Sequence, residues 1–159
     1  MQSKKTMSMS VHLTLRDSLQ DGVHGSYNSS NIHLDNVNVE NSGHHGVSVS
    51  GSKRNTMKNC NVSYSKQSGL CVSGGLMTID GNGTTIHHNC IYVRSWYYGL
   101  DANDYFSSIH LASPLTIETI SKNNGGGGNH GGSGKIKTVD KDGKVLEVVF
   151  DGRPDEEDV

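Results

Sequence analysis

The 159-residue chain repeats itself, and the repeat is clearest in one column of serine and glycine residues. When the sequence is aligned on four glycines that precede valine or leucine, a serine lies four residues before each of them. The aligned residues are Ser18, Ser42, Ser65 and Ser95, with Gly22, Gly46, Gly69 and Gly99. Two nearly equal steps and a longer third (18→42→65→95) are typical of a solenoid, whose surfaces are made of stacked side chains rather than of one contiguous motif.

The composition fits a thin, repetitive core. Only 32% of the residues are hydrophobic and 19% are charged, whereas a compact globular domain is nearly half apolar and a disordered chain is more highly charged. The formal charge of −2 gives no field that would attract nucleic acid or an anionic membrane, so we expect neither as a partner. No apolar run is long enough to span a bilayer, and the polar start does not resemble a signal peptide, so localisation and oligomeric state stay open.

The two clearest copies, residues 36–51 and 59–74, align position by position and predict short strands. In the first copy, valines alternate with polar residues at Val37, Val39, Val47 and Val49. This is the period of a strand with one face inward. The Asn, Ser and Gly residues between the strands favour bends, because Asn and Gly adopt positive φ readily. A third apolar pair, Ile32 and Leu34, precedes the first copy, so each repeat predicts one three-stranded coil of a parallel β-helix.

The next copy is longer. We align Asn89 and Cys90 with Asn59 and Cys60, which places the extra residues of this copy near residues 76–85. This alignment stacks the two cysteines in one inward column, where we expect them to be reduced. With weaker copies on either side, the repeat predicts an all-β solenoid of four to five coils.

The rest of the chain departs from the repeat. We expect, in order, a polar N-terminal segment (1–10), the β-helix (11–122), a Gly-rich linker or loose coil (123–134), a β-hairpin (135–150) and an acidic tail (151–159). The hairpin turns at Asp142-Gly143 and would cap the open strand edges of the last coil.

The pattern resembles the right-handed parallel β-helix repeat proteins of the pectin-lyase-like superfamily. The residues that carry the resemblance are NIHLDNVNVENSGHHGVSVSG (31–51), NTMKNCNVSYSKQSGLCVSG (55–74) and the stretch from 84 to 103. The resemblance implies a right-handed, single-stranded β-helix. Its members include polysaccharide lyases, epimerases and hydrolases, phage fibres and binding modules, so it does not choose an activity.

The turn between the paired strands predicts a binding face. In the predicted register Gln20, His44, Gln67 and Tyr97 stack, beside Asp21, His45, Ser68 and Tyr98, and beside Leu19, Gly43, Lys66 and Trp96. Aromatic rings can stack on the apolar face of a sugar while His, Gln and Lys bind its hydroxyls, and the same residue types anchor protein interfaces. The candidate ligand-binding residues are His44, Lys66, Gln67, Arg94, Trp96, Tyr97 and Tyr98.

A second predicted column holds Asp35, Lys58 and His88, one step before each bend. A carboxylate, an amine and an imidazole in a row could support proton transfer, and the resembled lyases and epimerases place acids and bases on the outside of the coil. The calcium-binding aspartates of those lyases are not found in a matching register. A ladder of complementary charges is the alternative interpretation.

No sequence motif predicts a metal site or a cofactor, although nine histidines are present. We therefore expect a non-catalytic β-helix module that binds a polysaccharide or a protein partner along one face of the coil. The alternatives are a short or truncated polysaccharide-acting enzyme that uses the Asp35 column, or a structural, fibre-like protein.

Overall fold

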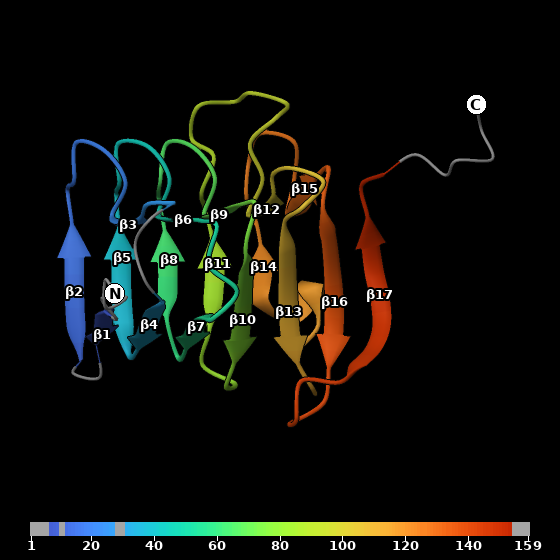
Figure 1. Cartoon of the computed structure of the whole chain (residues 1–159). Coiled ribbons are helices and arrows are strands. Elements are labelled where there is room, and N and C mark those ends of the chain that lie inside the picture. Colours follow the sequence, from blue (N-terminus) through green and yellow to red (C-terminus); the bar gives the residue numbers. More distant parts are fainter. Residues whose placement is uncertain (1–6, 10–11, 28–30, 154–159) are drawn as a thin grey trace.

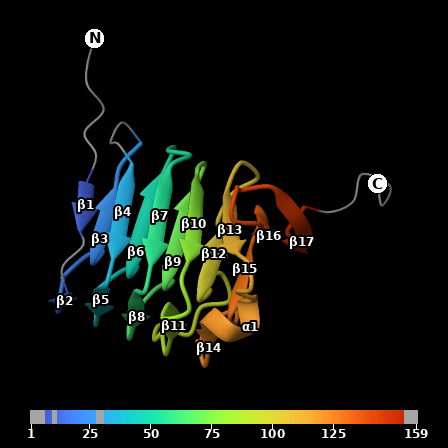
Figure 2. The ribbon, with the colours of Figure 1, turned by 90° about the horizontal axis from the view of Figure 1, so that it is seen from below.

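The structure, a computed structural model, describes residues 7–9, 12–27 and 31–153. Over these residues the chain winds into a parallel β-solenoid of about five coils, as the repeat predicts (Figure 1). Three sheets, here called A, B and C, run along the solenoid. Each coil passes through sheet B, then sheet C, then sheet A, and Figure 2 shows the strands of each sheet following one another from the blue first coil to the orange last coil.

The strands are short in all three sheets. Sheet A contains β1 (Met7–Met9), β4 (Ile32–Asp35), β7 (Asn55–Lys58), β10 (Leu76–Asp80), β13 (Ser108–Ala112), β16 (Lys135–Val139) and β17 (Val145–Asp151). Sheet B contains β2 (Leu13–Arg16), β5 (Val37–Glu40), β8 (Asn61–Ser63), β11 (Thr85–His87) and β14 (Ser121–Lys122). Sheet C contains β3 (Val23–Gly25), β6 (Val47–Ser50), β9 (Leu70–Ser73), β12 (Leu100–Ala102) and β15 (His130–Gly132).

The core is a set of apolar ladders inside the coil. In sheet B, Val62 lies beside Ile86. In sheet C, Leu70 lies between Val47 and Leu100. All of these side chains are buried, and Val47 pairs with Leu70 as the alignment of the two clearest copies predicts. The repeat and its alternating strand pattern are therefore both confirmed.

The predicted position of the extra residues was wrong. Ile86 stacks on Val62, which is a step of ordinary length, whereas Leu100 stacks on Leu70, which is a longer step. The additional residues therefore lie after β11, in the loop 88–99, and not near residues 76–85. The inward side chain of Ile86 decides the register, because a one-residue slip of a strand would turn its apolar side chain to the outside.

This register also separates the cysteines that were expected to stack. Thr84, and not Cys90, lies beside Cys60, where its hydroxyl accepts the Cys60 N–H at 3.3 Å. Cys90 is buried in the following turn at a φ of 61°. Cys60, Cys71 and Cys90 are all free thiols.

The solenoid continues beyond residue 122, into the segment for which a Gly-rich linker and a loose coil were both open. Residues 123–134 form a turn and β15, so they are part of the fifth coil rather than a linker. Gly131 is required there, because a Cβ at this position would lie 2.3 Å from the Tyr98 ring. Helix α1 (Ile117–Ile120) precedes β14 and buries Ile117 and Ile120.

The two ends of the chain meet the coil through sheet A. β1 pairs with β4, so part of the expected polar N-terminal segment is a strand. β16 and β17 form an antiparallel hairpin around Asp140–Lys144 at the other end. Residues 1–6, 10–11 and 154–159, which include most of the expected acidic tail, lie outside the described residues. No helix in the described part of the chain has the length and hydrophobicity to cross a membrane.

We expect Leu100→Ala to lower the free energy of unfolding by about 2–5 kcal/mol, because it opens a cavity in a fully buried ladder. Leu19→Ala is the matched control, since its side chain is 93% exposed, and it should change stability by less than about 0.5 kcal/mol. Urea denaturation measures both values. Equal effects of the two substitutions would contradict the assigned register.

Candidate functional site

The turn from sheet B to sheet C carries a row of unusual backbone conformations. Each strand of sheet B is followed by a residue with a positive φ, between 53° and 59°. These residues are Asp17, Asn41, Tyr64, His88 and Asn123. Asn, Asp and His adopt this conformation more readily than other non-glycine residues, but Tyr does so less often. The row presents polar and aromatic side chains on the outside of consecutive coils, because all five residues are exposed.

Neighbours in this row interact. The Asn41 side-chain amide donates to the Asp17 carboxylate at 2.7 Å. The Tyr64 and His88 rings stack with their centroids 5.4 Å apart and their planes 16° apart. His88 is also held by His87, whose Nδ1 lies 2.7 Å from the Nδ1 of His88. Burial and the neighbouring His88 lower the pKa of His87.

A shallow, open pocket of about 380 Å³ lies beside this row. Gly43, which has no side chain, is one of its lining residues, and a Cβ there would lie 2.2 Å from the Leu19 carbonyl oxygen. The Lys66 ammonium lies 5.8 Å from the centre of the Tyr92 ring, within the range of a cation–π contact. The pocket is lined by Asp17, Ser18, Leu19, Asn41, Gly43, His44, Lys66, Gln67 and Tyr92.

The structure brings three of the seven predicted ligand-binding residues together at this pocket. His44, Lys66 and Gln67 all line it. The predicted stacking of Gln20, His44 and Gln67 is confirmed by backbone hydrogen bonds, since His44 N–H donates to Gln20 and Gln67 N–H donates to His44. Their role in binding stays a prediction.

The fourth members of two predicted columns were wrong. The Cys90 N–H donates to the Gln67 carbonyl, and the Tyr92 N–H donates to the Lys66 carbonyl, so neither Tyr97 nor Trp96 occupies those places. The extra residues of loop 88–99 cause this shift. The column of Asp21, His45, Ser68 and Tyr98 is confirmed at every step, because the backbone N–H groups of Gly22, Gly46 and Gly69 donate to the carbonyls of His45, Ser68 and Tyr98.

The remaining predicted residues lie on the projecting part of loop 88–99. Trp96 is 58% exposed, and the Arg94 guanidinium lies 5.5 Å from its ring centre. The Tyr97 ring meets the Trp96 ring edge-on at 5.9 Å and the His45 ring edge-on at 6.1 Å. Tyr98 is turned away from this group, with its ring against Gly127 and Gly131.

Both ends of the loop are fixed. Asn89 is buried, and its side-chain carbonyl accepts the Ser65 N–H and hydroxyl at 3.0 and 2.7 Å. Its side-chain amide donates to the Val62 carbonyl at 3.0 Å. The Tyr98 N–H donates to the Ser68 hydroxyl at 3.1 Å. Apart from His88, the exposed residues of the loop are 91–96.

Sequence reasoning missed Tyr92, Asn41, Asp17 and Tyr64 as members of this face. Asn41 and Asp17 follow strand ends with residue types that favour positive φ, and this signal was available. Tyr92 could not be found while Asn89 and Cys90 were aligned with Asn59 and Cys60.

The column predicted for proton transfer is not formed. Asp35 lies beside Lys58 in sheet A, but the next residue in register is Asp80. His88 follows β11 of sheet B and stacks on Tyr64 instead. The sequence alignment assumed a longer step from β7 to the next coil. In the structure the step from β7 to β10 is short, so Asp80 rather than His88 lies in register with Lys58. Asp35, Lys58 and Asp80 alternate in charge, as in a structural ladder.

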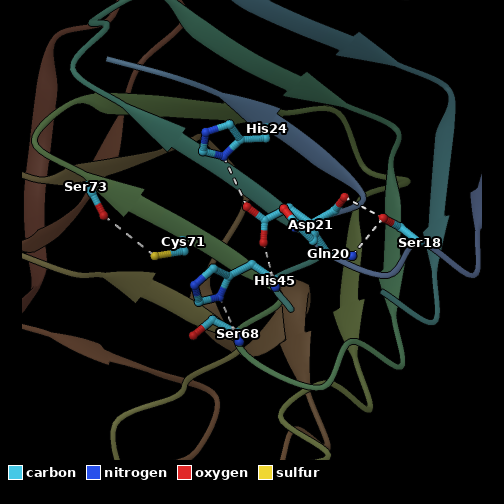
Figure 3. A network of polar contacts seen from close by, with 8 residues as sticks. All are labelled: Ser18, Gln20, Asp21, His24, His45, Ser68, Cys71 and Ser73. Carbon is cyan, nitrogen blue, oxygen red and sulfur yellow. Dashed lines mark hydrogen bonds and ion pairs between the residues drawn. The ribbon is translucent and has the colours of Figure 1, made fainter. Parts of the chain in front are cut away.

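A second polar group lies where the turn enters sheet C (Figure 3). The Asp21 carboxylate binds the His24 imidazole at 3.1 Å and accepts a hydrogen bond from the backbone N–H of His45 at 2.9 Å. The Nδ1 of His45 accepts the Ser68 N–H at 3.1 Å, which fixes the neutral tautomer with its proton on Nε2. Burial lowers the pKa of His45, against the opposing effect of Asp21.

Asp101 is a buried carboxyl group in contact with this group of side chains. It is 3% exposed, and one carboxyl oxygen accepts the Ser68 hydroxyl at 2.9 Å. The other oxygen has no hydrogen-bond partner among the described residues. Burial raises the pKa of Asp101 to about 7, and burial with the nearby Asp101 raises the pKa of Cys71 to about 12. Both groups are sealed from solvent, unlike the residues of the turn pocket.

The described residues contain no cluster of three or more His, Cys, Asp or Glu side chains that could hold a metal ion. Adjacent histidines such as His87 and His88 bind each other and Asn61 rather than converging on one point.

Fold and turn face together define a parallel β-helix repeat protein. A family model described as a right handed beta helix region matches residues 11–140, and the chain therefore belongs to this family. The match agrees with the expected right-handed coil and is consistent with the pectin-lyase-like superfamily. Comparison with curated proteins and with solved structures gave no match.

We expect Asp101→Asn to stabilise the protein above neutral pH. As pH rises from 3.8 to about 7, the unfolded chain ionises this carboxyl while the folded chain keeps its proton, so folding is progressively disfavoured. The difference in melting temperature between the variant and the wild type should grow across this window and stay constant above it. If the melting temperatures of the two proteins changed in parallel with pH, the raised pKa of Asp101 would be contradicted. His45 is present in both proteins, so its own effect on stability cancels in the difference.

Proposed function

We propose that this protein is a non-catalytic β-helix module that binds carbohydrate on the turn between sheets B and C. The observation that carries the proposal is the open pocket over Gly43, where the exposed Tyr92 ring stands beside the hydrogen-bonding side chains of His44, Lys66 and Gln67. A pyranose ring presents an apolar face for an aromatic ring and a rim of hydroxyls for polar side chains.

The neighbouring residues extend this site along the solenoid axis. The stacked Tyr64 and His88 rings and the exposed Trp96 ring lie on adjacent parts of the same turn face. Successive coils are about 4.8 Å apart, so this face offers one polar or aromatic side chain per coil to an elongated ligand. Anchoring at Asn89 and Tyr98 supports binding, because a fixed loop loses little conformational freedom when a ligand arrives.

We expect Tyr92→Ala and Lys66→Ala each to weaken glycan binding by about tenfold, through loss of the stacking surface and of a charged donor. A glycan array identifies the ligand, and calorimetry with the best glycan measures the change. Phe106→Ala is the control, because this aromatic side chain is 81% exposed but lies in the turn between sheets C and A. Loss of affinity in the control alone, or binding to no glycan, would contradict the proposed carbohydrate site.

A protein partner is the second candidate, and exposed aliphatic side chains favour it. Leu19 is 93% exposed, Val93 83% and Ile91 49%, all on the same turn face as the pocket. Apolar patches with aromatic and arginine residues are typical of protein interfaces. In this case Val93→Ser should abolish partner binding while glycan binding is retained, as measured by interferometry with each purified ligand. Unchanged partner binding in Val93→Ser would contradict this second candidate.

A further inference from the structure

The chain contains two Asn-Gly pairs, Asn82-Gly83 and Asn124-Gly125. They differ in how many hydrogen bonds hold them in the structure. In an Asn-Gly pair the backbone nitrogen of glycine can attack the asparagine side-chain carbonyl, because glycine has no Cβ to hinder the approach. Whether it does so depends on the freedom of the side chain and of the following N–H.

Asn82 is free to react. It lies exposed in the turn after β10, and its side chain makes no hydrogen bond within the described residues. The Gly83 N–H is exposed and donates only a long hydrogen bond of 3.3 Å, to the Asn59 side chain. Gly81, which precedes Asn82 in the same turn, has a φ of 80°, a conformation that glycine adopts readily.

Asn124 is held by a network. Its side-chain carbonyl accepts two hydrogen bonds from Asn89, both at 3.0 Å. Its amide nitrogen donates to Ile86, Ser121 and Asn129 at 3.0 to 3.1 Å. The Gly125 N–H is also engaged, donating to the Asn89 carbonyl at 2.9 Å. Cyclisation here would have to break these hydrogen bonds first.

We propose that Asn82 is a site of spontaneous covalent modification, which converts it to isoaspartate and aspartate in the folded protein, while Asn124 is protected. The Gly83 nitrogen forms a bond to the Asn82 Cγ, the Cγ–Nδ2 bond breaks, and ammonia leaves with the proton of the Gly83 N–H. Water then adds across either carbonyl–nitrogen bond of the succinimide, and the ring opens to aspartate or to isoaspartate. The product places a new carboxylate two residues after Asp80, at the end of the ladder formed by Asp35, Lys58 and Asp80.

The test is incubation of the full chain at mildly alkaline pH, followed by peptide mapping with mass spectrometry and by isoaspartate labelling. We expect the peptide containing Asn82 to gain one mass unit about tenfold faster, or more, than the peptide containing Asn124. In denaturant, where the network around Asn124 is lost, both should convert at similar rates.

Gly83→Ala is the matched variant. A Cβ at Gly83 would meet only the Asn59 side chain, at 3.0 Å, so the fold is kept while the attack is hindered. Conversion at Asn82 should fall about tenfold or more in this variant. Equal conversion of Asn82 and Asn124 in the folded chain would overturn the proposal. So would an unmodified Asn82 over a time in which the denatured chain reacts.

Discussion

Hydrogen bonding between parallel strands of successive coils fixes the register of the strand residues throughout the described solenoid. The coils stack through their backbones, and the side chains of each strand alternate between inside and outside. A slip of one residue would expose the ladder of Val39, Val62 and Ile86 and bury polar neighbours. Any irregularity in sequence length must therefore be taken up entirely within a turn.

Loop 88–99 is the clearest consequence of this constraint. Sheet B keeps its ordinary step into the fourth coil, from Val62 to Ile86, and sheet C takes a longer one, from Leu70 to Leu100, so the turn between them absorbs the difference. The added residues cannot enter the core, and several are apolar or aromatic. The same length change that the coil must exclude thus supplies the exposed surface beside the Gly43 pocket.

The sequence predicted the parts of the fold that follow from regular alternation. The valine strands, the ladder from Val47 through Leu70 to Leu100 and the hairpin at Asp142-Gly143 all depend on local patterns. The sequence did not predict the correct register where two alignments of the repeat matched equally well. The Asn-Cys pairs at 59–60 and 89–90 are alike in sequence, but only burial of Ile86 decides which residues stack.

Other features could not be predicted because they arise from contacts across coils. Tyr64 adopts a backbone conformation that its residue type disfavours, and it is the ladder on either side that imposes it. The contact of Tyr97 with His45 depends on the course of a loop rather than on register. The buried Asp101 gives no sequence signal, since aspartate at an outward position is expected to be solvated.

The two polar regions of the molecule have opposite physical characters, and this favours the turn as the binding surface. Where the turn enters sheet C, His45, Ser68 and Asp101 are linked by hydrogen bonds and leave little capacity for a ligand. On the turn, Lys66, Gln67 and Tyr92 line an open pocket. The buried side-chain amide of Asn89 connects the exposed loop 88–99 to the coil below it, because it binds Ser65 in the same turn that carries Lys66. A ligand on this face would meet side chains whose backbone is already fixed by the coil, so most of its binding energy would not be spent on ordering the protein.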